Sequence, residues 1–176
     1  MIFEKMKKQV QLSTYSVIIS LLSYGILIGL LLWQFKRTGD ELYAWLLLTI
    51  IVAWSFLVLF YTPMSIAVND RELSINRSLK IKTIPLSEIS DVRLSPPTLG
   101  ERRICGSGGF FGYWGWFSQR DLGRYFAYYG KASDCFLVTL KDGRKYMLGC
   151  KDAPSMVAAI ESRLPEVAVN NGVRQI

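Results

Sequence analysis

The stretch LKDGRKYMLGCKDAPSMVAAIESRL, residues 140–164, decides the fold. Its Asp142-Gly143 dipeptide is typical of a tight β-hairpin turn, and it joins two predicted strands, at 135–140 and 145–149. Apolar residues then recur at the spacing of an amphipathic helix, and Asp152 is placed to cap the start of that helix through its carboxylate. The stretch therefore predicts a strand hairpin that runs directly into a C-terminal helix.

Alternating apolar and polar residues predict five more strands upstream of this hairpin. Together with the hairpin they give seven short strands and one closing helix, which is an α+β, mainly β, domain. We expect this domain at residues 62–165, followed by a C-terminal tail at 166–176. The upstream strands are expected at 64–68, 73–76, 81–86, 91–94 and 124–129.

This order of elements is that of the pleckstrin-homology (PH) fold, and the sequence resembles the bacterial PH-like domain families. The segment IKTIPLSEISDVRL, residues 81–94, is similar to their third strand, turn and fourth strand, and residues 140–164 are similar to their final hairpin and closing helix. The resemblance covers roughly residues 62–165. It implies an orthogonal sandwich of two sheets, plugged at one end by the helix. Members are often tethered to membranes and mostly lack an assigned activity, so the resemblance implies a fold more firmly than a function.

Two uncharged stretches precede this domain and predict transmembrane helices. The sequence has no charged residue at 9–35 or at 42–69. We expect spans at about 12–35 and 42–61, each long enough to cross roughly 30 Å of hydrocarbon as a helix. Neither span has the polar face of a helix in a soluble protein. The six-residue link at 36–41 forces the two spans into an antiparallel hairpin.

The basic residues around the spans predict that both termini face the cytoplasm. Three lysines precede the first span and four basic residues follow the second closely, whereas the link carries only Lys36 and Arg37. By the positive-inside rule, residues 1–61 form a multi-pass anchor in the cell (inner) membrane, with the domain on its cytoplasmic side. The three cysteines form no C-x-x-C pair, which fits a reducing compartment.

The charge of the domain favours an anionic partner. Residues 62–176 contain 16 basic and 11 acidic residues, a net charge of +5. Membrane lipid fits a tethered domain of this charge, because each well-placed Lys or Arg contributes about 1 kcal/mol at an anionic surface. No recognised nucleic-acid motif is present, so we expect no nucleic-acid partner. Phosphoinositide-binding PH domains carry several basic residues in the loop between the first two strands, but here that loop, 69–72, is short and roughly neutral.

The most unusual segment is CGSGGFFGYWGWF, residues 105–117, which is similar to a glycine-rich insertion before the fifth strand in one bacterial PH-like family. A dinucleotide loop needs G-x-G-x-x-G before a helix, but the third position counted from Gly106 and Gly108 is Phe111, and no helical pattern follows. A phosphate loop needs Gly-Lys-Ser/Thr, which is absent. The segment therefore predicts no cofactor.

Two interpretations of this segment remain. The aromatic side chains either fold over the sandwich as core or lie at the bilayer interface, where Trp and Tyr are favoured. Because one residue separates Trp114 from Trp116, both rings point to the same side of an extended strand, and we expect at least one of them at the interface. The first strand starts at the membrane, so connections after the second and fourth strands return to it. The other interface or ligand candidates are therefore Phe110, Phe111, Arg102, Arg103, Arg77 and Lys80.

Catalysis is not expected. Without histidine, a general base would have to be a perturbed carboxylate, lysine or tyrosine, and the carboxylates that flank the glycine-rich segment are Glu101 and Asp121. No set of nucleophile, base and oxyanion donors assembles, and the absence of histidine and of paired cysteines argues against a metal site. The sequence favours a non-enzymatic module that binds lipid headgroups or a protein partner. The alternatives are a structural or regulatory subunit whose spans dock onto another membrane protein and, third, an enzyme.

Small residues predict how the two spans pack. Gly25 and Gly29 form a small-xxx-small face that lets helix backbones approach closely. Counted from the middle of the link, these glycines lie level with Ala53 and Thr49. We expect an intramolecular contact between the two faces, with homodimerisation through the glycines as the alternative.

Overall fold

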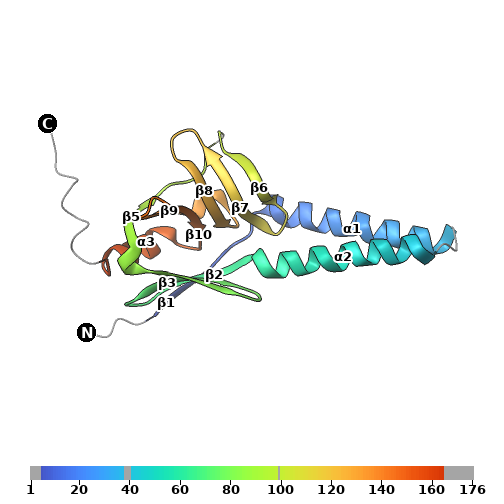
Figure 1. The fold of residues 1–176 in the computed structure, drawn as a ribbon, viewed down its shortest axis with the longest axis horizontal. Coiled ribbons are helices and arrows are strands. Elements are labelled where there is room, and N and C mark those ends of the chain that lie inside the picture. The colour runs from blue at the N-terminus through green and yellow to red at the C-terminus, as the bar shows by residue number, and fades with distance from the viewer. Residues whose placement is uncertain (1–4, 38–40, 99, 165–176) are drawn as a thin grey trace.

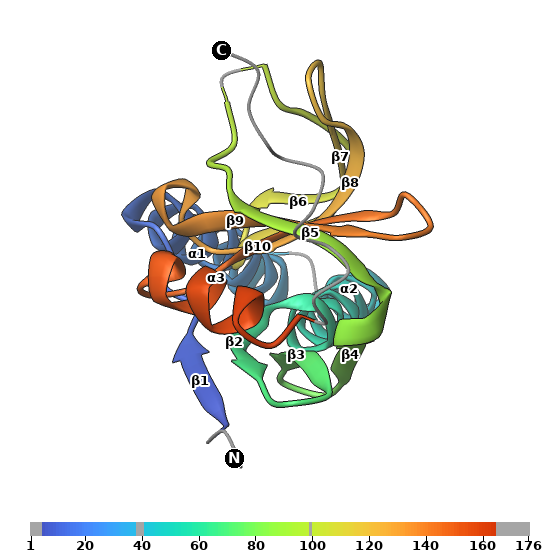
Figure 2. The same cartoon turned by 90° about the vertical axis from the view of Figure 1, so that its left-hand side faces the viewer.

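Two long helices extend from one side of a β-sandwich (Figure 1). The computed structural model describes residues 5–37, 41–98 and 100–164. The helices are α1 (Thr14–Arg37) and α2 (Glu41–Tyr61), and a third, α3 (Ala153–Glu161), lies at the opposite end of the sandwich (Figures 1 and 2). We refer to α1 and α2 together as the helical hairpin.

The first sheet has four antiparallel strands in the order β1-β2-β3-β4. The turn between β2 and β3 is closed by Asn69, whose Oδ1 accepts hydrogen bonds from the backbone N–H groups of Arg71 and Glu72 at 2.9 and 2.7 Å. The strands are β1 (Met6–Gln9), β2 (Pro63–Val68), β3 (Glu72–Arg77) and β4 (Ile81–Pro85).

The second sheet has six strands in the order β5-β9-β10-β8-β7-β6. The Asp142-Gly143 turn joins β9 to β10 as the sequence predicts, and Gly143 has the positive φ, 86°, that glycine adopts readily. β8 pairs in parallel with β10, so the meander β6–β7–β8 extends this sheet. The strands are β5 (Ile89–Leu94), β6 (Arg102–Gly109), β7 (Gly112–Gln119), β8 (Gly123–Tyr129), β9 (Cys135–Leu140) and β10 (Lys145–Gly149).

The sandwich closed by a C-terminal helix is confirmed, but the described residues form ten strands rather than seven. All seven predicted strands are present, as β2 to β5 and β8 to β10. The sequence did not predict β6 and β7, because glycine has a low strand propensity and interrupts the alternation of apolar residues. It did not predict β1 because four residues with two lysines give almost no periodic signal.

The core lies between the two sheets and beneath α3. Met156 and Ile160 of α3 are fully buried in it, as the helical spacing predicts. Ile66 and Ile75 contribute from the first sheet, and Leu148 contributes from the second. Asp152 does precede α3, but it adopts φ 60°, and its carboxylate binds the ammonium group of Lys8 at 3.0 Å. The residue predicted to cap the helix thus ties it to β1.

The helical hairpin is inserted between two neighbouring strands of the first sheet. β1 leads into α1, and α2 leads into β2, so the sheet includes residues from both sides of the predicted boundary at residue 62. Ser13 fixes the start of α1, because its Oγ accepts the N–H of Ser16 at 3.1 Å. The N–H of Ser13 donates to the Gly130 carbonyl oxygen at 2.9 Å, next to the end of β8. The hairpin is therefore attached to both sheets.

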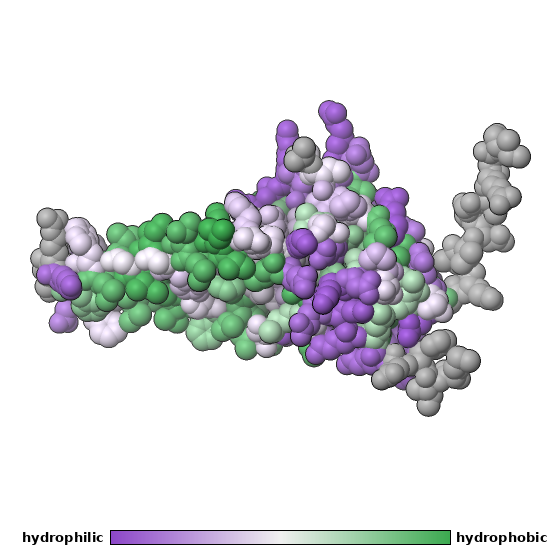
Figure 3. All heavy atoms as spheres, turned by 180° about the vertical axis from the view of Figure 1, so that it is seen from behind, coloured by the Kyte–Doolittle hydropathy of each residue, from purple (hydrophilic) through white to green (hydrophobic). Residues whose placement is uncertain are grey.

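Both helices are long and apolar enough to cross a membrane, and they expose that apolar surface. Only 11% of the apolar window of each helix is buried, whereas a core helix of a soluble protein is mostly buried. Figure 3 shows the projecting helices as largely hydrophobic and the sandwich as largely hydrophilic. Length, composition and exposure together permit membrane insertion.

The two helices touch through a different face from the predicted one. A Cβ atom added at Gly25 or Gly29 would meet nothing within 4 Å, and Thr49 and Ala53 are exposed. The contact instead contains a hydrogen bond between the hydroxyls of Tyr24 and Ser55, 2.8 Å apart. The predicted packing of small residues within the hairpin is therefore wrong. A polar side chain on an apolar helix is more stable when it forms a hydrogen bond in the contact between helices than when it lies in apolar surroundings without a partner.

We expect Gly130→Ala to destabilise the junction between sandwich and helical hairpin. An added Cβ would collide with the Gln11 carbonyl oxygen in the link between β1 and α1. We predict a loss of about 1–3 kcal/mol in the free energy of unfolding, measured by urea titration of the full chain in mild detergent. Gly100→Ala is the matched control, because its Cβ would lie 3.8 Å from the Thr98 hydroxyl, and it should change stability by less than about 0.5 kcal/mol. Equal losses for the two variants would contradict this account of the junction.

Candidate functional site

Several of the predicted interface residues lie where the helical hairpin joins the sandwich. The turn between β6 and β7 carries Phe110 and Phe111 and reaches back along the helices (Figure 1). The Phe110 ring lies 5.7 Å from the ring of Tyr24 and 5.4 Å from that of Trp54. The N–H of Phe111 donates to the Ser20 hydroxyl at 2.8 Å. Both phenylalanines therefore dock onto the helices.

This docking depends on a facing pair of glycines in β6 and β7. Gly106 and Gly115 are opposite each other, with φ of 122° and 121°. A Cβ atom on Gly106 would collide with the Trp114 carbonyl oxygen, and one on Gly115 with that of Cys105. The glycines thus permit a close approach and backbone conformation that other residues avoid. The sequence resembles a glycine-rich insertion here, and in the structure this segment forms a β-hairpin that is directed toward the helices.

The two tryptophans of β7 have different surroundings. Trp114 stacks on Tyr61, the last residue of α2, with ring centroids 5.0 Å apart and planes 12° from parallel, and it packs against the main core. Trp116 packs edge-on against Phe126 and stays 46% exposed. Trp114 is thus partly core, and Trp116 is available to a surface. An interfacial position for Trp116 stays a prediction.

The basic candidates fall into separate groups. Arg77 is only 8% exposed, and its guanidinium lies 5.6 Å from the Phe60 ring centroid and 5.5 Å from that of Tyr128. The ammonium group of Lys80 lies 5.5 Å from the same Phe60 centroid. Two of the predicted cations thus meet on one ring at the sandwich end of α2, within cation–π distance.

Arg102 and Arg103 are not brought together, because successive residues of a strand point to opposite faces. Arg102 lies beside Ser118 and Gln119 of β7, away from the helices. The side chain of Arg103 reaches Gly108 of the same strand, where its Nη1 would be 3.3 Å from an added Cβ atom. Of the two, Arg103 faces the helical hairpin.

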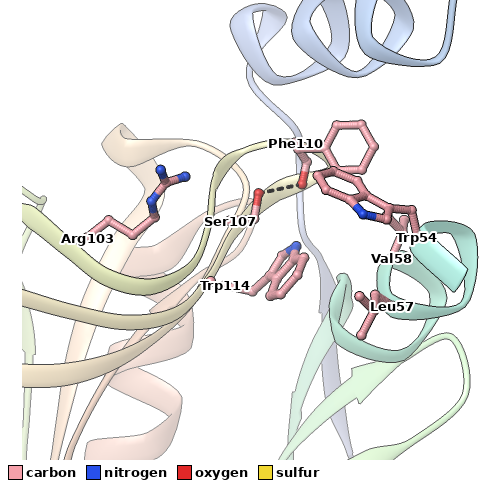
Figure 4. A pocket seen from close by; sticks show the side chains of 8 residues that line it. Trp54, Leu57, Val58, Arg103, Ser107, Phe110 and Trp114 are labelled. Atoms are coloured by element: carbon pink, nitrogen blue, oxygen red, sulfur yellow. Dashed lines mark hydrogen bonds between the residues drawn. The ribbon is translucent and has the colours of Figure 1, made fainter. Parts of the chain in front are cut away.

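A pocket of about 230 Å³ lies between α2 and the β6–β7 hairpin, beside the contact of Phe110 with Trp54. Its polar lining includes Ser107, whose hydroxyl donates to the Phe110 carbonyl oxygen at 2.8 Å, and Trp114, whose Nε1 is buried and has no hydrogen-bond partner in the described part of the chain (Figure 4). The full lining comprises Trp54, Leu57, Val58, Arg103, Gly106, Ser107, Phe110 and Trp114. The sequence did not identify the α2 residues, because a pocket-facing Leu or Val in an apolar helix gives the same signal as a lipid-facing one.

The opposite face of the second sheet has a structural role. The hydroxyls of Tyr125 and Tyr129 both donate to the carboxylate of Glu101. Burial first, and then Glu101, raise the pKa of both tyrosines well above the usual value. Glu101, a candidate base in the sequence, thus holds the segment before β6 against the sheet, while Asp121 lies exposed. This arrangement fixes the loop that precedes β6.

Two of the three cysteines are small buried side chains. Cys135 and Cys150 are buried, and Cys105 is exposed on β6. Burial raises the pKa of Cys150 to about 12 and that of Cys135 further, so both remain thiols at neutral pH.

Comparison with known families gives one match. The profile of a family described as Bacterial PH domain matches residues 64–164, from the second residue of β2 to just beyond α3. The match includes the β6–β7 hairpin and excludes β1, α1 and α2. No curated protein and no solved structure matches the chain significantly.

Gly106→Ala should undo the docking of the β6–β7 hairpin. The added Cβ would meet backbone at a positive φ, and we expect a loss of about 2–4 kcal/mol in the free energy of unfolding, measured by urea titration in mild detergent. Gly108→Ala, two residues away, is the control, because its Cβ would meet only the mobile end of Arg103 and should cost about 0.5 kcal/mol or less. If both variants were as stable as the wild type, the glycine pair would not be what shapes the hairpin.

Proposed function

The chain belongs to the bacterial PH domain family, and we propose that it is a non-enzymatic binding module that two transmembrane helices anchor in the cell membrane. In this proposal α1 and α2 cross the bilayer, and the sandwich lies against its cytoplasmic surface with both termini on that side. The module binds anionic lipid headgroups of that surface.

The position of the basic residues carries this proposal. Arg77, Lys80 and Arg103 surround the sandwich end of α2, where the apolar surface of the helices gives way to the polar domain. If α2 spans the bilayer, these cations lie at the depth of the lipid phosphates. The exposed cations Lys80 and Arg103 can then each contribute about 1 kcal/mol of attraction to anionic lipid, whereas Arg77 is buried between two aromatic rings.

A second candidate is a subunit that docks onto another membrane protein through its helices. It is favoured by small residues on the surface of each helix, because a Cβ atom added at Gly25 or Gly29 would meet nothing within 4 Å, and Thr49 and Ala53 are exposed. Such small residues allow close approach of a further helix, from another protein or from a second copy. A stoichiometric membrane protein that co-purifies in mild detergent would favour this candidate.

The proposed topology predicts the behaviour of reporter fusions. A cytoplasmic reporter fused after Ile176 should be active and an exported one inactive, because the basic residues keep both ends inside. A fusion to a chain truncated after Lys36, between the helices, should give the reverse pattern. The opposite result for the two fusions would invert the topology, and a chain extracted from membranes by carbonate would contradict the anchor.

Contact of the sandwich with the bilayer surface predicts lipid-dependent quenching of Trp116. In a variant whose only tryptophan is Trp116, headgroup-depth spin-labelled lipid should quench the emission, and aqueous iodide should quench it weakly. Circular dichroism controls for folding of the variant. Strong quenching by iodide without quenching by labelled lipid would show that Trp116 lies away from the bilayer surface and would contradict this prediction. The variant replaces Trp33, Trp45, Trp54 and Trp114 with Phe.

A further inference from the structure

We propose that the pocket between α2 and the β6–β7 hairpin holds one anionic phospholipid of the surrounding leaflet. Its phosphate group lies beside Arg103 and Trp114, and the start of an acyl chain lies against the α2 wall of the pocket. This proposal rests on the proposed function, because a bilayer lipid reaches the pocket only if α1 and α2 span the membrane.

The depth of the pocket matches the boundary between headgroups and hydrocarbon. α2 has 21 residues and is therefore about 31 Å long, close to the roughly 30 Å thickness of the hydrocarbon core. Trp54, Leu57 and Val58 lie within seven residues of its sandwich end, so they are within about 10 Å of the boundary. A lipid phosphate and the first chain carbons occupy this depth.

The wall of the pocket continues onto the lipid-facing surface of α2. Trp54 and Leu57 line the pocket and yet are each 48% exposed. The volume of about 230 Å³ is below the 300–1,000 Å³ of typical small-molecule pockets. It therefore suits one end of an amphiphile whose remaining chain stays in the bilayer.

The polar lining suits an acceptor with negative charge. The buried Nε1–H of Trp114 has no partner in the described part of the chain, and such a donor costs about 1–3 kcal/mol when it is left unpaired. A phosphate or ester oxygen of a lipid would accept this hydrogen bond. Figure 4 shows the nitrogen edge of the indole turned toward Ser107 and Phe110.

Arg103 supplies the positive charge. It is exposed and lines the pocket, and the ion pairs found in the described ranges do not involve it. The pocket lining contains no carboxylate side chain that would repel a phosphate. A cation and an unpaired donor beside an apolar wall favour an anionic phospholipid over a zwitterionic one.

The test is a titration of the delipidated full chain in detergent with phosphatidylglycerol, followed by native mass spectrometry. The salt concentration is about 0.5 M, which shortens the Debye length to roughly 4 Å and suppresses diffuse attraction. We expect one phosphatidylglycerol per chain and weaker binding of phosphatidylcholine. Arg103→Gln should raise the Kd for phosphatidylglycerol about fivefold. Trp114→Phe, which keeps the ring and removes the donor, should raise it about two- to tenfold.

Matched controls separate the pocket from general effects of charge and ring content. Arg93→Gln removes an exposed arginine of β5, and Trp45→Phe changes a tryptophan in the first turns of α2, far from the sandwich. Both should bind lipid like the wild type. Circular dichroism of each variant checks that it is folded.

Each outcome decides the proposal. Deacylated glycerophosphoglycerol and inorganic phosphate should not displace the lipid; if either does so as well as phosphatidylglycerol, the site binds a free anion and the proposal is overturned. It is also overturned if the chain binds no lipid, binds phosphatidylcholine equally, or loses no affinity in Arg103→Gln. None of these results contradicts the membrane anchor if the reporter fusions support it. The opposite pattern in the reporter fusions would instead contradict the proposed function itself.

Discussion

The structure depends on the pairing of β1 with β2, because this pair fixes both ends of the helical hairpin. Neighbouring strands lie about 4.8 Å apart, whereas packed helices lie about 8–10 Å apart, so the links to the helices must diverge from adjacent positions in one sheet. The hydrogen bond from Ser13 to Gly130 then ties the start of α1 to the second sheet. With the helices held on both sides, the β6–β7 hairpin has a fixed surface on which Phe110 and Phe111 dock.

The parts of the fold that the sequence predicted are those with a local signal. The Asp142-Gly143 turn, the apolar stripe of α3 and the uncharged stretches each occur within one segment and need no knowledge of its neighbours. β1 lacks such a signal because it is short and pairs with β2 across the two helices, and the β6–β7 hairpin lacks one because its glycines interrupt the apolar alternation. The contact between α1 and α2 was assigned at the correct level but to the wrong face. The level at which two residues of the helices meet follows from counting residues along the chain. The rotation of each helix about its axis depends on which polar side chains form hydrogen bonds across the contact.

The candidate site was predicted in part for a similar reason. Tryptophan in a glycine-rich segment and arginine just before it are conspicuous, so Trp114 and Arg103 could be found from the sequence. Their positions could not, since Arg102 and Arg103 separate to different faces and Trp114 stacks on Tyr61, at a distance of many residues along the chain. The α2 wall of the pocket was missed because composition does not distinguish a helix side that meets lipid from one that meets another part of the chain.

The insertion of α1 and α2 between β1 and β2 also fixes an order of assembly during synthesis. A ribosome makes β1 before the helices and its partner β2 after them, so the first strand of the chain must wait unpaired until about fifty further residues have been made. The first sheet cannot close around a chain that stops within the helices. Completion of the sandwich domain therefore requires that both helices have been synthesised.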